Sequence, residues 1–162
     1  MSYRTVSMLA AIVLVFAFQS CGKKQTQEEL HNQAQAYEQE EDYAEALKSY
    51  KKLLENYPEG DSADVAVRKI AFLYYNNFPE YEKAIEYHRK LIEDYPESES
   101  VPQSRFMIGY IYANNLNEYD KAKEAYNEFL KHHPENELVE SVKWELEHLG
   151  QDINQQLKTL FG

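Results

Sequence analysis

Residues 43–59 read YAEALKSYKKLLENYPE, and similar stretches occupy residues 81–97 (YEKAIEYHRKLIEDYPE) and 119–135 (YDKAKEAYNEFLKHHPE). The starts of the three stretches are 38 residues apart, so the chain contains an internal repeat of that period. Within each copy the aromatic and aliphatic residues fall at offsets 0, 3, 7, 10 and 11. That spacing places them on one side of an α-helix, so each stretch is predicted to be an amphipathic helix.

Each repeated helix is expected to end just before its proline, at Pro58, Pro96 or Pro134. Proline has no backbone N–H to donate, and it biases the preceding residue away from the helical conformation. A second amphipathic stretch precedes each repeated helix, and both stretches carry a small residue at a fixed place. These small residues are Ala34, Ala71 and Gly109 upstream and Ala46, Ala84 and Ala122 in the repeated helix. The two helices are therefore expected to pack closely and antiparallel.

This pattern of small residue, Tyr three positions later, Ala in the next helix and closing Pro resembles the tetratricopeptide repeat (TPR). The resemblance implies an all-α fold, a right-handed α-solenoid of about three TPR helix pairs plus C-terminal capping helices. It divides residues 28–136 into three TPR-like repeats. The expected repeats are 28–60, 61–98 and 99–136. The long period and the Tyr-Pro ending look like the repeats of bacterial envelope lipoproteins, including the outer-membrane β-barrel assembly lipoprotein and the periplasmic cell-division coordinator.

The third copy departs from the family pattern in its first helix. The position that the family fills with Trp holds Leu30 and Val67 in the first two copies, but Arg105 in the third. The apolar stripe continues after the last repeat, so residues 137–162 are expected to form C-terminal capping helices, Glu137 to Leu149 and Asp152 to Phe161. Gly150 can end the first of them in a left-handed conformation. The alternative is that this segment is a coupling surface for a partner.

The N-terminus reads as a secretion signal. Arg4 precedes Val6 to Phe18, a run with only Ser7 polar, and the one cysteine of the chain, Cys21, follows Ser20. Such a run spans about 20 Å as a helix, which is short of a bilayer core of about 30 Å. The Ser-Cys junction resembles the lipobox of bacterial lipoproteins.

The lipobox resemblance implies that residues 1–20 are removed and that Cys21 becomes the acylated first residue. Residues 21–27 would then be a lipidated N-terminus and a short tether, carrying fatty chains such as palmitate. Gly22 resembles the outer-membrane sorting class, which implies anchoring at the outer membrane. The alternative is an ordinary secretory signal with an incidental cysteine.

Composition excludes several classes of function. With 17 Lys and Arg against 28 Asp and Glu, the formal net charge is -11, so no nucleic-acid partner is expected. One cysteine excludes a disulfide framework, and no His pair with metal-ligand spacing occurs, so no metal site is indicated. There is no Gly-rich phosphate loop and no Ser in a nucleophile-elbow context. We therefore predict a protein that is not an enzyme, with no catalytic residues, no cofactor and no small-molecule substrate.

Function is expected on the concave surface that the first helices of the repeats would line. In tetratricopeptide repeats, which the sequence resembles, the residues one and five places after the position usually held by Trp point toward the concave surface. Tyr75 and Met107 are expected to extend this strip of inward-pointing residues. The predicted partner groove consists of Arg68, Phe72, Tyr75, Phe106, Tyr110, Trp144 and His148. Aromatic residues are enriched where proteins bind partners, so an apolar or aromatic peptide is expected. The alternative is that some of these side chains fill gaps between repeats.

Two functions therefore follow from the sequence. The first is a membrane-anchored scaffold that mediates protein–protein interaction in the bacterial cell envelope by binding a partner segment along its concave face. The second is an accessory subunit of outer-membrane β-barrel protein assembly.

Overall fold

The computed structural model describes residues 24–151, and these residues form seven α-helices and no strand. The predicted all-α fold is confirmed. The helices are α1 (Gln27–Gln39), α2 (Tyr43–Asn56), α3 (Ala63–Asn76), α4 (Tyr81–Asp94), α5 (Val101–Asn114), α6 (Tyr119–His132) and α7 (Val139–Glu147). The predicted signal peptide, Cys21 and the predicted terminal helix from Asp152 to Phe161 lie outside the described residues.

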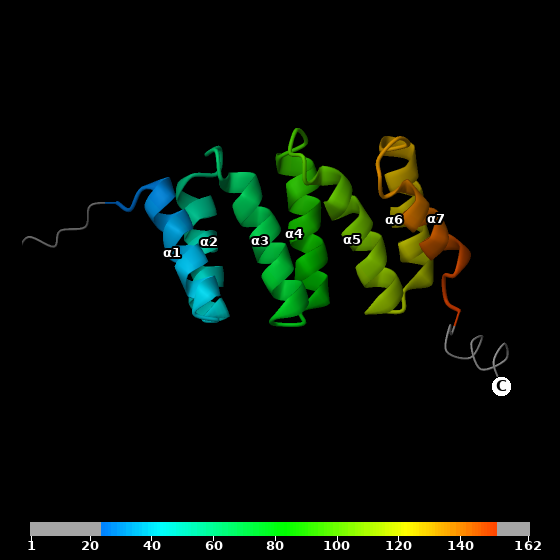
Figure 1. The fold of residues 1–162 in the computed structure, drawn as a ribbon, viewed down its shortest axis with the longest axis horizontal. Helices are drawn as coiled ribbons and strands as arrows, with labels where there is room; N and C mark the ends of the chain where they lie inside the picture. The colour runs from blue at the N-terminus through cyan, green and yellow to red at the C-terminus, as the bar shows by residue number, and fades with distance from the viewer. Residues whose placement is uncertain (1–23, 152–162) are drawn as a thin grey trace, which may run out of the picture.

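Helices that follow one another in the chain pack against each other. The pairs α1 with α2, α3 with α4 and α5 with α6 pack most extensively, and each pair packs on the next through α2 with α3 and α4 with α5. Figure 1 shows the helices in chain order along the long axis of the molecule, with α1 at one end and α7 at the other. This is the arrangement of a TPR-like solenoid, in which each helix pair buries its apolar face against its neighbours.

The periodic positions of the repeated helices form the core. Offsets 3, 7 and 10 are buried in all three copies, although offset 7 holds His88 in the second copy. These buried residues are Ala46, Tyr50 and Leu53 in α2, Ala84, His88 and Leu91 in α4, and Ala122, Tyr126 and Phe129 in α6. One side chain per turn of each helix is thus removed from water, which is the main free-energy term that holds the solenoid together.

The predicted small residues permit close helix approach. Ala34 and Ala71 are fully buried, and Gly109 is buried in α5. A Cβ atom on Gly109 would lie 2.5 Å from Cδ1 and Cε1 of Tyr126. α5 can therefore rest on the ring of Tyr126 only because position 109 has no side chain.

The repeated helices end where the sequence predicts. α2, α4 and α6 stop before Tyr57, Tyr95 and His133, and each of these residues has a non-helical backbone conformation and precedes a proline. The turn after each proline also repeats, because α3, α5 and α7 begin at residues 63, 101 and 139, which are 38 residues apart.

The first of the two predicted capping helices is shorter than predicted. α7 runs from Val139 to Glu147 rather than from Glu137 to Leu149, because the Leu138 N–H donates to Oδ1 of Asn136 in a turn that precedes the helix. Gly150 does adopt a left-handed conformation, with φ +74. Tyr119 at offset 0 is 42% exposed, whereas Tyr43 and Tyr81 are partly buried.

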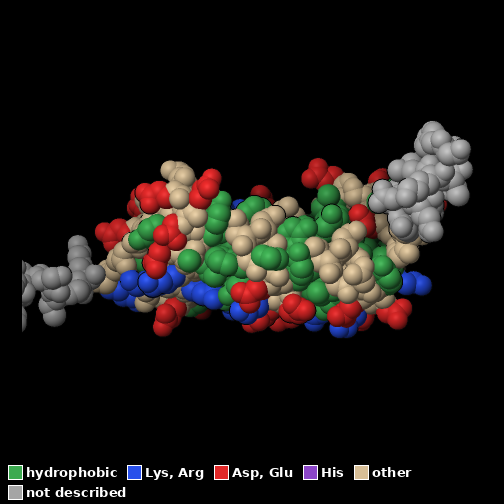
Figure 2. All heavy atoms as spheres, turned by 90° about the horizontal axis from the view of Figure 1, so that it is seen from below, with side chains coloured by type: hydrophobic (Ala, Val, Ile, Leu, Met, Phe, Trp, Pro, Cys, Tyr) green, Lys and Arg blue, Asp and Glu red, His purple; other side chains and the backbone are tan. Residues whose placement is uncertain are grey.

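The surface is strongly acidic, as the composition implies. Seen from the end where the turns within each helix pair lie, hydrophobic side chains run along the middle and acidic side chains gather at the edges (Figure 2). Within residues 24–151, no helix combines the length and the apolar character needed to cross a membrane.

Candidate partner-binding groove

A cavity of about 240 Å³ opens between α3 and α5 over one side chain of α4. It is the place where several predicted groove residues meet. Its walls are Arg68, Phe72, Tyr75 and Asn76 of α3, His88 of α4, and Gln103 and Met107 of α5. The α3 residues recur at the spacing of one helix face, so α3 contributes a continuous wall.

The cavity lies beside a residue that breaks the repeat. The other two copies hold tyrosine at offset 7: the Tyr50 hydroxyl donates to Oε1 of Glu38 at 2.5 Å, and the Tyr126 hydroxyl donates to Oε2 of Glu145 at 3.3 Å. His88 occupies this position in α4. An imidazole is shorter than a phenol, so His88 leaves space that a tyrosine would occupy.

His88 is held as a neutral side chain. It is 6% exposed, and its Nδ1 lies 3.1 Å from Oγ of Ser104, which is itself buried. Burial lowers the pKa of His88 from 6.5 to about 4, because the charged imidazolium would lose its hydration. The inner end of the cavity is therefore uncharged at neutral pH.

The rim of the cavity combines an exposed aromatic ring with one cation. Phe72 is 52% exposed. Arg68 lies one helical turn before it, and among the ion pairs of residues 24–151 none involves Arg68. Tyr75 packs at 6.0 Å from the ring of Tyr81, so it is fixed against the next helix.

Phe106 and Tyr110 lie on α5 next to this cavity but do not line it. Their ring centroids are 5.9 Å apart, and Phe106 is also 6.1 Å from the ring of Tyr126. Phe106 is partly buried against the core cluster that Tyr126 and Phe129 form. Its packing inside the third helix pair therefore also contributes to the fold.

Trp144 and His148 form a separate pair on the cap. Their rings stack with centroids 4.4 Å apart and an interplanar angle of 21°, and Nδ1 of His148 lies 2.8 Å from the Trp144 carbonyl oxygen. Trp144 remains 48% exposed. Among residues 24–151, no ring contact joins this pair to Phe106 or Tyr110.

Sequence reasoning placed Arg68, Phe72, Tyr75 and Met107 on one strip, and the structure brings these four residues to one cavity. The sequence did not predict that Asn76, Gln103 and His88 also line the cavity. The available signal was His88 itself, a histidine in a column that otherwise holds tyrosine.

Among residues 24–151, no group of three or more His, Cys, Asp and Glu side chains is placed to hold a metal ion. The cavity walls offer apolar contact, one guanidinium and two amides.

The fold, the N-terminal sequence and the groove point to an envelope lipoprotein, and a comparison with protein families decides the matter. Residues 23–123 match the family described as YfiO, outer membrane lipoprotein. The chain belongs to the YfiO family of outer membrane lipoproteins. The match to the YfiO family covers α1 to α5 and the start of α6, and so includes every wall of the cavity. No curated protein matches the chain.

Membership of the YfiO family places the chain at the outer membrane of the bacterial envelope and agrees with the TPR-like helix pairs. Trp144 and His148 lie beyond the matched residues, on the cap.

Proposed function

We propose that this YfiO-family lipoprotein is a scaffold that binds a segment of an envelope protein along the face formed by α3 and α5. The cavity between these helices carries the proposal, because Phe72 stays half in solvent at its rim while Tyr75, His88 and Met107 form its walls. An exposed phenyl ring beside an apolar cavity is typical of a surface that a partner covers.

The bound segment would insert a bulky apolar side chain beside Phe72 and Met107. The backbone of the segment could hydrogen-bond to the amides of Asn76 and Gln103, which line the same cavity. Phe106, Tyr110, Trp144 and His148 would extend the contact toward the cap. The proposal assigns the protein no catalytic step of its own and no cofactor.

Anchoring through Cys21 supplies the second half of the proposed role. α1 begins at Gln27, so residues 22–26 would separate an acylated Cys21 from the first helix. Five extended residues reach at most about 18 Å. The proposed repeats, 28–60, 61–98 and 99–136, would therefore be held close to the membrane surface, where nascent envelope proteins are met.

The match to the YfiO family favours a more specific version, in which the scaffold is an accessory subunit of outer-membrane β-barrel protein assembly. In that case the bound segment would belong to a component or a client of the assembly machinery. Mass spectrometry of co-purified proteins separates the two versions, because a stable complex with a barrel protein supports the second.

The test is co-purification of the full lipoprotein from detergent-solubilised membranes, comparing the wild type with Phe72→Ala and Met107→Ala. Both side chains line the cavity, so each variant should reduce recovery of the partner at least fivefold. Lys48→Ala on α2 is the matched control, because Lys48 is exposed and does not line the cavity. Circular dichroism should show equal helix content in all four proteins. Equal partner recovery by folded Phe72→Ala and Met107→Ala proteins would contradict the proposal.

A further inference from the structure

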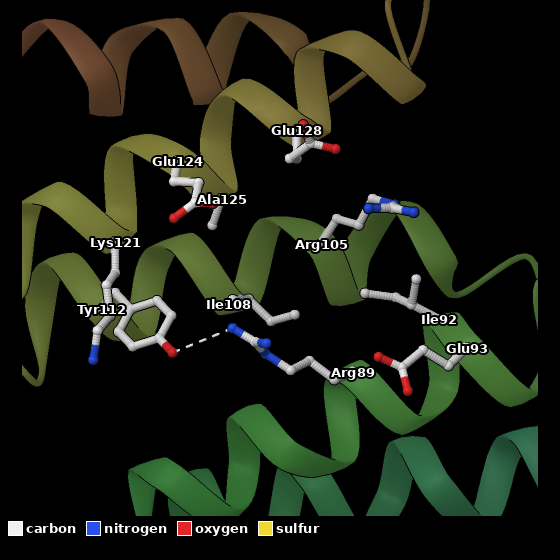
Figure 3. A pocket seen from close by; sticks show the side chains of 10 residues that line it. All are labelled: Arg89, Ile92, Glu93, Arg105, Ile108, Tyr112, Lys121, Glu124, Ala125 and Glu128. Atoms are coloured by element: carbon white, nitrogen blue, oxygen red, sulfur yellow. Dashed lines mark hydrogen bonds between the residues drawn. The ribbon is translucent and has the colours of Figure 1, made fainter.

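A second groove, larger than the first, lies between α4 and α6 with α5 as its floor. Its volume is about 490 Å³. Figure 3 shows Arg89 and Glu93 projecting from α4, Lys121, Glu124 and Glu128 from α6, and Arg105, Ile108 and Tyr112 from α5. The proposed scaffold function uses none of these side chains.

The two grooves lie on opposite sides of α5. Each residue of an α-helix is rotated by about 100° from the one before it. By that geometry Gln103 and Met107, which line the first cavity, point roughly opposite to Arg105 and Tyr112, which line the second. A ligand of the second groove is therefore distinct from the partner segment proposed above.

The arginines of the second groove lack carboxylate partners although the chain is rich in carboxylates. Of the described lysines, seven make an ion pair with Asp or Glu. No ion pair among residues 24–151 involves Arg89 or Arg105, even though the sequence holds 28 acidic residues against 17 basic ones. Arginine is the side chain best suited to hold a carboxylate with two hydrogen bonds, so two unpaired arginines in one groove are unexpected.

Arg105 interrupts the apolar seam of the solenoid. The matching residues of the first two repeats, Leu30 and Val67, are fully buried. The Nε atom of Arg105 is buried and has no hydrogen-bond partner within the described structure. An apolar residue at this position would continue the seam, whereas a buried guanidinium N–H without an acceptor costs free energy.

Arg89 also lines the groove between α4 and α6. Its Nη2 atom lies 3.4 Å from the hydroxyl oxygen of Tyr112, a long contact that leaves most of the guanidinium donors available (Figure 3). The other cation of the groove, Lys121, is already paired with Glu118, and Glu128 is paired with Lys131 and His132. The donors left to receive an anion are those of the two arginines.

The remaining walls restrict what the arginines can accept. Ile92, Ile108 and Ala125 offer apolar contact, while the carboxylates of Glu93 and Glu124 repel a ligand that is acidic throughout. The ligand chemistry that satisfies both conditions is a segment with two carboxylates separated by apolar residues.

We propose that the groove between α4 and α6 binds a second protein segment of this kind, with Arg89 and Arg105 each holding one carboxylate and Ile108 contacting the apolar residues between them. This surface would let the scaffold hold two proteins at once, one on each side of α5.

The test measures binding of short peptides to the full lipoprotein in detergent by fluorescence anisotropy. The probes are fluorescein-labelled peptides with blocked ends, in which two glutamates flank zero, one, two or three leucines. Because charge-assisted hydrogen bonds to two arginines are involved, at least one probe should bind the wild type at least tenfold more tightly than its glutamine counterpart. Arg89→Gln and Arg105→Leu should each weaken that binding at least tenfold. Lys123→Gln, which removes an exposed charge from α6 without touching the groove, should bind as the wild type does.

Thermal unfolding shows whether each variant is folded, and Arg89→Gln serves if Arg105→Leu does not fold. Absence of binding by every probe, or equal binding by a folded Arg89→Gln protein, would overturn the proposal. Sedimentation gives the remaining outcome: if the wild type self-associates and Arg89→Gln is monomeric, the groove takes a second copy of this chain and the proposed separate partner is wrong.

Discussion

Nδ1 of His88 lies 3.1 Å from Oγ of Ser104, and this contact joins α4 to α5 at the position where the other two helix pairs use tyrosine. The pair is buried, because His88 is 6% exposed and Ser104 is 1% exposed. Burial lowers the pKa of His88 from 6.5 to about 4, so we expect acid to destabilise the interface between the second and third helix pairs.

His88 should make the free energy of unfolding fall between pH 6.5 and about pH 4. In that range the unfolded chain binds a proton at this imidazole while the folded chain does not, so protonation favours unfolding. The loss should reach about 3 kcal/mol for a pKa difference of this size, and should level off below pH 4. Urea titrations of the wild type and His88→Gln at several pH values measure it. The two stabilities should diverge on acidification, whereas parallel pH profiles would show that His88 is not buried as a neutral group. His132→Gln, at an exposed position, is the control.

Gly109 should be intolerant of a methyl group even though alanine is the better helix former. A Cβ atom there would lie 2.5 Å from two ring carbons of Tyr126, a buried aromatic that cannot move freely. Overpacking of a core typically costs about 1–3 kcal/mol, which exceeds the roughly 1 kcal/mol that alanine gains in helix propensity.

The measurement for Gly109→Ala is the urea midpoint, with Gln103→Ala on the exposed side of the same helix as control. The Gln103 variant should stay within about 0.5 kcal/mol of the wild type. A Gly109→Ala protein as stable as the wild type would mean that α5 and α6 are farther apart than the structure has them.

Cys21→Ser should release the protein from the membrane. The proposed anchor is acyl chains on this residue, and serine has no thiol to accept them. Fractionation of cells, with metabolic labelling by an alkyne fatty acid, measures the effect. Label and membrane location should disappear together in Cys21→Ser. A variant that stays quantitatively in the membrane fraction would show that acylation of Cys21 is not the anchor.

Local periodicity was sufficient to predict the helices, because each repeat makes its main contacts with its neighbours. The buried column Ala46, Ala84 and Ala122 and the ends of α2, α4 and α6 follow from residue spacing and from proline chemistry alone. The 38-residue period also predicts the start of α7 at residue 139, because α3 and α5 begin 76 and 38 residues earlier. The prediction of a start at Glu137 followed the apolar pattern and overlooked the repeated turn.

The cavity walls could be predicted only in part. The inward residues of α3 follow from helix geometry, but the cavity is also lined by His88, Gln103 and Met107 from two other helices, and their meeting there requires the fold. Likewise, Arg105 is visible in the sequence as a break in an apolar column, whereas its buried Nε and the nearby Arg89 come from different helices and require the fold. Contacts between helix pairs depend on side-chain shape, and a periodic pattern does not carry that information.

The central claim is that a partner segment lies in the cavity between α3 and α5, and photocross-linking in living cells tests it most directly. p-Benzoylphenylalanine in place of Phe72 resembles the native side chain and sits at the cavity rim, and the same residue in place of Ala44, exposed on α2, is the control. We predict a discrete adduct at position 72 whose cross-linked peptide contains a bulky apolar residue, and no such adduct at position 44. An absent adduct at position 72, or the same adduct at both positions, would contradict the account.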